Sequence, residues 1–222
     1  MTNKRRKWKS KGNKEMKKQI DSKKMSLYLM AILINALGNS FMIVATVGSA
    51  PWTAASEALS EVSPFSVGTS VVVLHTIALL IALSIGSTFR LWTIVESFLL
   101  AVVFGLAIDA FMLIHEVFYI PTALIGRVSY FLIGVPLISL GLSLYLQIGY
   151  ILMPPDYLMK SLIVKFKKTS IGATISLAIP FLLACLLSLF KQEWIGIGVG
   201  TLVFLIVNGP LIDWFQRLFP IR

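Results

Sequence analysis

The sequence predicts an all-α membrane protein with about six transmembrane helices, built as two inverted three-helix repeats that each carry a short amphipathic or re-entrant helix. Hydrophobic residues make up 57% of the 222 residues and charged residues only 14%, whereas a soluble domain carries roughly 25% charged residues. The apolar residues gather in runs near the length that crosses a bilayer, and the two halves of the chain resemble each other. These observations exclude an ordinary soluble fold.

The first 24 residues form a basic tail. They hold eleven Lys and Arg against Glu15 and Asp21, which accounts for +9 of the net charge of +10. Directly before a hydrophobic segment, such a run is typical of a cytoplasmic anchor attracted to anionic lipid headgroups, and a nucleic-acid arm is the less simple interpretation. The tail residues expected to contact headgroups are Lys4, Arg5, Arg6 and Lys7. The apolar segment that follows is longer than the h-region of a signal peptide, so we expect it to be the first span.

Six apolar runs of about 20 residues predict the membrane spans. They lie at 25–47, 66–86, 92–114, 129–150, 171–190 and 195–215. With the tail inside, seven further basic residues fall on the cytoplasmic side and two outside, in agreement with the positive-inside rule. We therefore expect a multi-pass protein of the plasma membrane with both chain ends in the cytoplasm. The predicted organisation is a tail at 1–24, a first repeat at 25–114, an extracellular connection at 115–128, a second repeat at 129–217 and a cytoplasmic end at 218–222.

Four short blocks recur in the same order in the two halves of the chain, at an offset of 103 residues for the first two and 104 for the last two. Their expected structural positions are Pro51, Gly68 and Gly105 in the first copy and Pro154, Gly172 and Gly209 in the second. Because each copy has three spans, the second copy must enter the membrane from the opposite side, as in many secondary transporters.

The polar connections at 51–63 and 154–168 each open with proline and place apolar residues at helical spacing. They predict short amphipathic helices. Such a helix could lie on the membrane interface as an anchor, or it could be re-entrant and point its N-terminus at a polar pocket between the repeats.

Polar residues within or beside the spans are candidates for a substrate or coupling site, because an ionisable group at bilayer depth usually faces protein or water. The candidates are His75, Asp109, Asp213, Asp156, Thr53, Glu96, Asn35 and Asn208. Structural alternatives exist for most of them. The histidine and the asparagines could make interhelical hydrogen bonds, the aspartates that close each repeat could be solvated at helix ends, and the glutamate could stabilise a helix N-terminus.

Catalytic and metal chemistry are not indicated. The single cysteine, Cys185, lies in an apolar run, so no intramolecular disulfide and no cysteine-based metal site are predicted. No hydrolase-type triad spacing and no phosphate-binding loop of the GxxxxGK[ST] type occur. We expect neither an enzyme nor a cofactor.

The repeated motifs carry a family resemblance over about residues 30–217. They comprise a glycine block in the first span of each half, the segments at Pro51 and Pro154, a Ser-Val/Ile-Gly opening of the next span, and Gly-x-x-Ile-Asp in the third. In these motifs the chain resembles the YczE/YyaS/YitT-like integral membrane proteins of bacteria. It departs from their pattern at Thr53, where the second copy keeps Asp156. The resemblance implies a bacterial plasma-membrane protein and supplies no activity.

The duplication and the intramembrane polar residues favour a transporter-like protein that handles a small solute between the repeats. The alternative is a non-transporting membrane protein that binds a partner or supports export, biosynthetic or regulatory machinery, and the basic tail favours it if an acidic partner is recruited. A third alternative is a solute-binding subunit energised by separate proteins. Expected partners are anionic lipids at the tail, a small-molecule solute and a second copy of the chain in a homodimer, with nucleic acid disfavoured.

Overall fold

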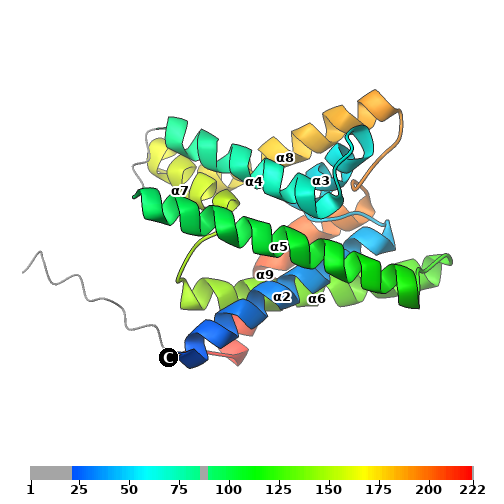
Figure 1. The fold of residues 1–222 in the computed structure, drawn as a ribbon, viewed down its shortest axis with the longest axis horizontal. Coiled ribbons are helices and arrows are strands. Elements are labelled where there is room, and N and C mark those ends of the chain that lie inside the picture. Colours follow the sequence, from blue (N-terminus) through cyan, green and yellow to red (C-terminus); the bar gives the residue numbers. More distant parts are fainter. Residues whose placement is uncertain (1–21, 86–89, 222) are drawn as a thin grey trace, which may run out of the picture.

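The computed structural model describes residues 22–85 and 90–221, which form helices joined by short loops (Figure 1). The long helices are α2 (Ser22–Ala45), α4 (Val67–Ser84), α5 (Leu91–Phe118), α6 (Leu124–Ile148), α8 (Thr169–Lys191) and α9 (Val199–Leu218). Two short helices, α3 (Pro51–Val62) and α7 (Pro154–Phe166), lie between them in sequence. Six helices in the described ranges are long and apolar enough to cross a membrane. The predicted all-helical fold with six candidate spans is confirmed.

The helices pack in two layers (Figure 1). In one layer, helices α2 and α6 cross at the centre, while α5 packs against α2 and α9 packs against α6. In the other layer, helices α4 and α8 are bridged by α3 and α7, each of which packs against both. Helices α2 and α6 run in opposite directions, as do α4 and α8, and α5 and α9. The two short helices lie toward opposite ends of the bundle.

The central crossing of α2 and α6 depends on glycine. A Cβ atom on Gly38 would lie 2.6 Å from the backbone nitrogen of Ile138 and 2.8 Å from the carbonyl oxygen of Gly134. A Cβ atom on Gly141 would lie 2.7 Å from the backbone nitrogen of Asn35 and 2.7 Å from the carbonyl oxygen of Ala31. Small residues at these positions let the two backbones touch, as is common where membrane helices associate.

The short helices are inside the bundle. Helix α3 begins at Pro51, whose missing N–H is no loss in a first helical turn, and its Ala54, Ala55 and Ala58 side chains are fully buried. Helix α7 likewise begins with proline and buries Leu158 against α4. Both short helices are therefore packed between the long helices of the bundle.

Helix bounds differ from the predicted spans at three places. Helix α5 continues to Phe118 and α6 starts at Leu124, so the connection expected at 115–128 is much shorter. Helix α9 starts at Val199, later than expected, because Gly196 adopts a positive φ of 67° and the preceding loop pairs with the loop after α2. In that pairing the N–H of Ser49 donates to the carbonyl of Gly196 at 2.8 Å. Helix α2 begins at Ser22, within the segment expected to be tail.

The tail residues expected to contact lipid headgroups lie outside the described ranges, so that contact stays a prediction. At the other end of the chain, the N–H of Ile221 donates to the Gln147 side-chain oxygen at 3.0 Å. The residues after α9 are thereby held against the end of α6.

Candidate functional site

A central cavity of about 180 Å³ lies where the two layers meet, and each of the eight described helices contributes to its wall. The polar side chains that line it are Asn35, Asn39, Thr53, His75, Asp156, Ser176 and Asn208. Five of the eight predicted site residues are therefore brought together from five different helices. The N-terminal turns of both short helices also line the cavity, with Pro51 from α3 and Pro155 from α7.

A chain of hydrogen bonds fixes one wall of the cavity. The hydroxyl of Thr53, in the first turn of α3, donates to Oδ1 of Asn39 at 2.5 Å. The Asn39 amide nitrogen donates in turn to Oδ1 of Asn35 at 2.7 Å. All three side chains are buried, so their polar groups would be costly to leave unpaired. This chain ties the N-terminus of α3 to α2.

Asp156 lines the cavity from the first turn of α7 and is held there by a tyrosine. Tyr145 of α6 donates its hydroxyl to Oδ2 of Asp156 at 2.7 Å and accepts the N–H of Met153 at 2.5 Å. Burial raises the pKa of Asp156, while the hydrogen bond from Tyr145 and the charge of Lys160 act in the opposite direction. The carboxylate is thus held in one orientation by a buried tyrosine.

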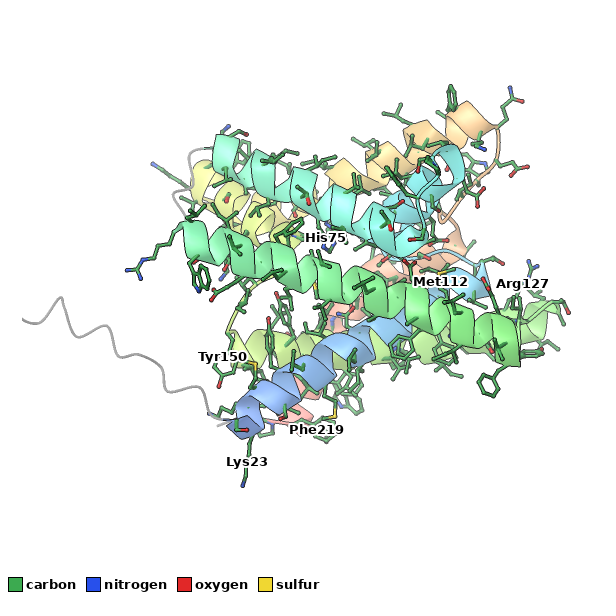
Figure 2. All side chains as sticks on the ribbon, in the orientation of Figure 1. Lys23, His75, Met112, Arg127, Tyr150 and Phe219 are labelled. Atoms are coloured by element: carbon green, nitrogen blue, oxygen red, sulfur yellow. The ribbon has the colours of Figure 1, made fainter. Side chains whose placement is uncertain are left out.

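His75 sits in an aromatic environment in the interior of the bundle (Figure 2). Its ring stacks on Phe104 of α5 with centroids 6.1 Å apart and meets the Trp52 ring edge-on at 6.0 Å. The side chain is 4% exposed, and its Nδ1 atom has no hydrogen-bond partner among the described residues. A buried nitrogen of this kind is unusual and calls for a ligand or water.

Asn208 completes the polar wall from α9. Its Oδ1 atom accepts a hydrogen bond of 2.9 Å from the hydroxyl of Ser139 on α6. This bond is the interhelical contact expected of an asparagine inside a span, and the residue also lines the cavity. Asn208 therefore makes the predicted interhelical hydrogen bond and lines the cavity, while its role in a substrate site stays a prediction.

Asp109 lies outside the cavity and caps α4. Its Oδ1 atom accepts the N–H of Gly68 at 2.7 Å, and its Oδ2 atom accepts the hydroxyl of Ser66 at 2.6 Å. Beside it, Gly68 and Gly105 are in backbone contact. The carboxylate thus joins the C-terminal half of α5 to the positive N-terminal end of α4.

We call the contact of Asp109 with Ser66 and Gly68 a latch. The duplicate latch in the second half of the chain, at Asp213, is not formed. Asp213 of α9 is exposed and makes no hydrogen bond within the described ranges, and a Cβ atom on Gly209 would meet nothing within 4 Å. Gly172 instead packs against Ile163 of α7. Helices α8 and α9 are therefore parted where α4 and α5 are joined.

The structure separates one predicted residue from the site and adds three residues that were not predicted. Glu96 is partly buried near the start of α5 and does not line the cavity. Sequence reasoning missed Asn39, Trp52 and Tyr145. Asn39 follows Asn35 by one helical turn, which was an available signal, but nothing in the sequence places Tyr145 of α6 beside the aspartate of α7.

A second cavity, of about 470 Å³, opens at the end of the bundle that carries α3. Its charged lining residues are Glu57, Glu61, Glu116 and Glu193. Oε1 of Glu57 is buried without a hydrogen-bond partner in the described residues. Burial raises the pKa of Glu57 to about 8; the nearby Ser49 hydroxyl partly offsets this effect, and the Glu61 carboxylate adds a smaller increase.

This pKa predicts a pH-dependent stability. The pKa of Glu57 is about 8 in the folded state and ordinarily 4.5, so the unfolded chain loses this proton at a lower pH than the folded protein does. The free energy of unfolding should therefore fall as the pH rises from 4.5 to about 8. Glu57→Gln should remove that loss and raise the melting temperature of the purified protein at pH 9 while leaving it unchanged near pH 5. The control is Glu193→Gln, which alters an exposed carboxylate of the same cavity. An equal effect of both variants at pH 9 would contradict the assignment.

The apolar helices and the buried polar cavity define a multi-pass helical membrane protein. Residues 22–217 match the model of the Family of unknown function (DUF6198), and the chain belongs to this family. It is 30% identical over 197 residues to the uncharacterized protein YyaS of Bacillus subtilis, covering 88% of this chain and 93% of that one. It is 26% identical over 196 residues to an uncharacterized protein of Haemophilus influenzae, covering 88% and 84% of the two chains. The predicted resemblance to YyaS-like proteins is confirmed, and no solved structure matches the chain.

Proposed function

We propose that this protein is a transporter of the plasma membrane that binds a small polar solute in the central cavity and exposes it alternately to the two sides. The observation that carries the proposal is the cavity itself, since every described helix lines it and both re-entrant N-termini reach it. Transporters built from inverted repeats place their substrate site at such a junction near the membrane midplane.

The contacts of α2 and α6 support two inverted repeats. At the offset of 103 residues, Gly38 corresponds to Gly141, and the two residues that Gly38 approaches correspond to the two that Gly141 approaches. Thr53 and Asp156 correspond in the same way, and both line the cavity from the first turn of a short helix. Together with the opposite directions of the paired helices, these contacts fit a two-fold axis between the halves.

The unequal latches support alternation between two states. Because the motif is repeated, each aspartate could cap the N-terminus of the span before its own. Asp109 does so, whereas Asp213 is exposed. We infer that the halves hold different conformations at one time and exchange them when the cavity changes sides. Such an exchange needs only small free-energy differences between the two packings.

The charge distribution supports an orientation for this cycle. The basic tail and the basic connections belong on the cytoplasmic side by the positive-inside rule. The end of the bundle with α3 and the acidic cavity then faces outward, and the end with α7 faces the cytoplasm.

The test is two-sided access to the central cavity. In a Cys185→Ala background, Ser176→Cys places one thiol in the cavity wall. A membrane-impermeant methanethiosulfonate reagent should label it in right-side-out vesicles and also in inverted vesicles. The matched control is Ser143→Cys, which is fully buried in α6 away from the cavity lining and should resist labelling from both sides.

Labelling of Ser176→Cys from one side only, in protein that remains folded, would contradict alternating access. The same experiment after deletion of residues 2–20 separates transport from recruitment by the tail. Access should survive this deletion, since each of the helices α2 to α9 already contributes described residues to the cavity wall.

A further inference from the structure

The charged residues that line both cavities are of one sign. The central cavity has Asp156, and the second cavity has Glu61, Glu116 and Glu193, beside Glu57, whose raised pKa keeps it mostly protonated at neutral pH. Among the described residues, no Lys or Arg lines either cavity, although the whole chain carries a net charge of +10. Acidic side chains raise the local concentration of cations, and in the central cavity Asp156 does so against the partial positive charge of the N-terminal ends of α3 and α7.

The aromatic groups of the central cavity are also suited to a cation. Trp52 and Phe104 both line it and flank the His75 ring. Aromatic faces attract ammonium groups, and the attraction grows when the cation is stripped of water. The unpartnered Nδ1 atom of the 4% exposed His75 can accept a hydrogen bond from an ammonium N–H.

Asp156 supplies the countercharge. Tyr145 occupies its Oδ2 atom and fixes the carboxylate, but its neutral hydroxyl brings no positive charge into the cavity. The neighbouring cation on the same helix, Lys160, is exposed and does not line the cavity. Lys160 favours the ionised form of Asp156 from outside the cavity, and a cation bound inside the cavity would stabilise this carboxylate further.

The N-terminus of α3 adds a donor site on the same cavity. Pro51 has no N–H, and within the described residues no acceptor pairs with the backbone N–H of Trp52 or Thr53. These groups can donate to a hydroxyl oxygen of the same solute.

We propose that the central cavity binds a small organic ammonium ion, with Asp156 as its counterion and the Trp52 and Phe104 rings against its charged group. The acidic residues of the second cavity raise the concentration of such cations on the outer side of the protein. This inference rests on the proposed transport function and names its substrate class.

The experiment compares probes of matched shape on the purified full-length protein in lipid nanodiscs. Choline and ethanolamine are the cationic probes. The neutral isostere of choline is 3,3-dimethylbutan-1-ol, and glycine betaine is its zwitterionic counterpart. Isothermal titration calorimetry should give a Kd for one of the two cations at least about tenfold lower than for the alcohol or the betaine, because only the cations bring a net positive charge to Asp156 and the aromatic rings.

Asp156→Asn should weaken binding of that cation by at least about tenfold while it keeps an acceptor for Tyr145. The matched control, Glu96→Gln, removes a partly buried carboxylate that lines neither cavity and should bind like the unchanged protein. If Asp156→Asn does not fold, Phe104→Leu provides the second variant, with a loss of roughly threefold or more from one aromatic face.

Equal binding of the alcohol and the cations, tighter binding of the betaine, or failure of both cations to bind would overturn the inference. So would unchanged cation binding by Asp156→Asn. Two-sided labelling of Ser176→Cys uses no solute, so these results and a failure of alternating access are distinguishable.

Discussion

Gly209→Leu is expected to leave the protein folded and to confine access to the central cavity to one side of the membrane. Open space surrounds the position, so a leucine fits the packing described here. In the opposite state, α9 would have to close on α8 as α5 now closes on α4 through Gly105 and Gly68. A leucine would block that closure, because overpacking a tight contact costs about 1–3 kcal/mol.

Gly105→Leu is the matched variant and should confine access to the central cavity to the other side of the membrane. Its side chain would collide with the backbone of Gly68 in the present packing, so the joined state of α4 and α5 would be disfavoured. In the background of Cys185→Ala and Ser176→Cys, the labelling rates from the two sides should change by roughly tenfold or more, and in opposite directions in the two variants. Loss of stability in both variants, or equal access from both sides, would contradict the exchange.

The membrane spans could be predicted from the sequence because their signal is local. Twenty apolar residues cross a bilayer whatever they pack against, and six such helices lie in the described ranges. Helix ends were less predictable. The start of α9 is delayed by the positive φ of Gly196 and by pairing with the distant Ser49, and hydropathy carries no information on either.

Some of the residues that line the cavity could be predicted, because they stand at equivalent positions of the two repeats. Thr53 and Asp156 stand at equivalent positions of the two copies, and His75 stands out as an ionisable residue in an apolar run. The difference between Asp109 and Asp213 could not be predicted, because identical motifs have identical local preferences. Only the packing of whole helices decides which of the two is docked.

The hydrogen-bond partners of the site were also beyond sequence reasoning. Tyr145 orients Asp156 across the loop between α6 and α7, where Gly149 adopts the left-handed conformation that turns the chain. The counterpart of Tyr145 in the first copy, at the offset of 103 residues, is Met42, which cannot donate such a hydrogen bond. The two halves therefore share a backbone plan and differ in chemistry.

The central claim, that the two halves exchange conformations, is tested most directly by cross-linking the two latches. In a Cys185→Ala background, one protein carries Ser66→Cys with Asp109→Cys, and a second carries the duplicate pair, Ser170→Cys with Asp213→Cys. The first pair is adjacent in the structure, since the Ser66 hydroxyl and Oδ2 of Asp109 are 2.6 Å apart. The duplicate pair lies on two helices that are parted.

Both pairs should cross-link in native membranes with a short bifunctional thiol reagent, and each cross-link should leave the cavity open to a different side. Cross-linking of the first pair alone, after exposure long enough for the cavity to be labelled from both sides, would contradict the exchange of conformations.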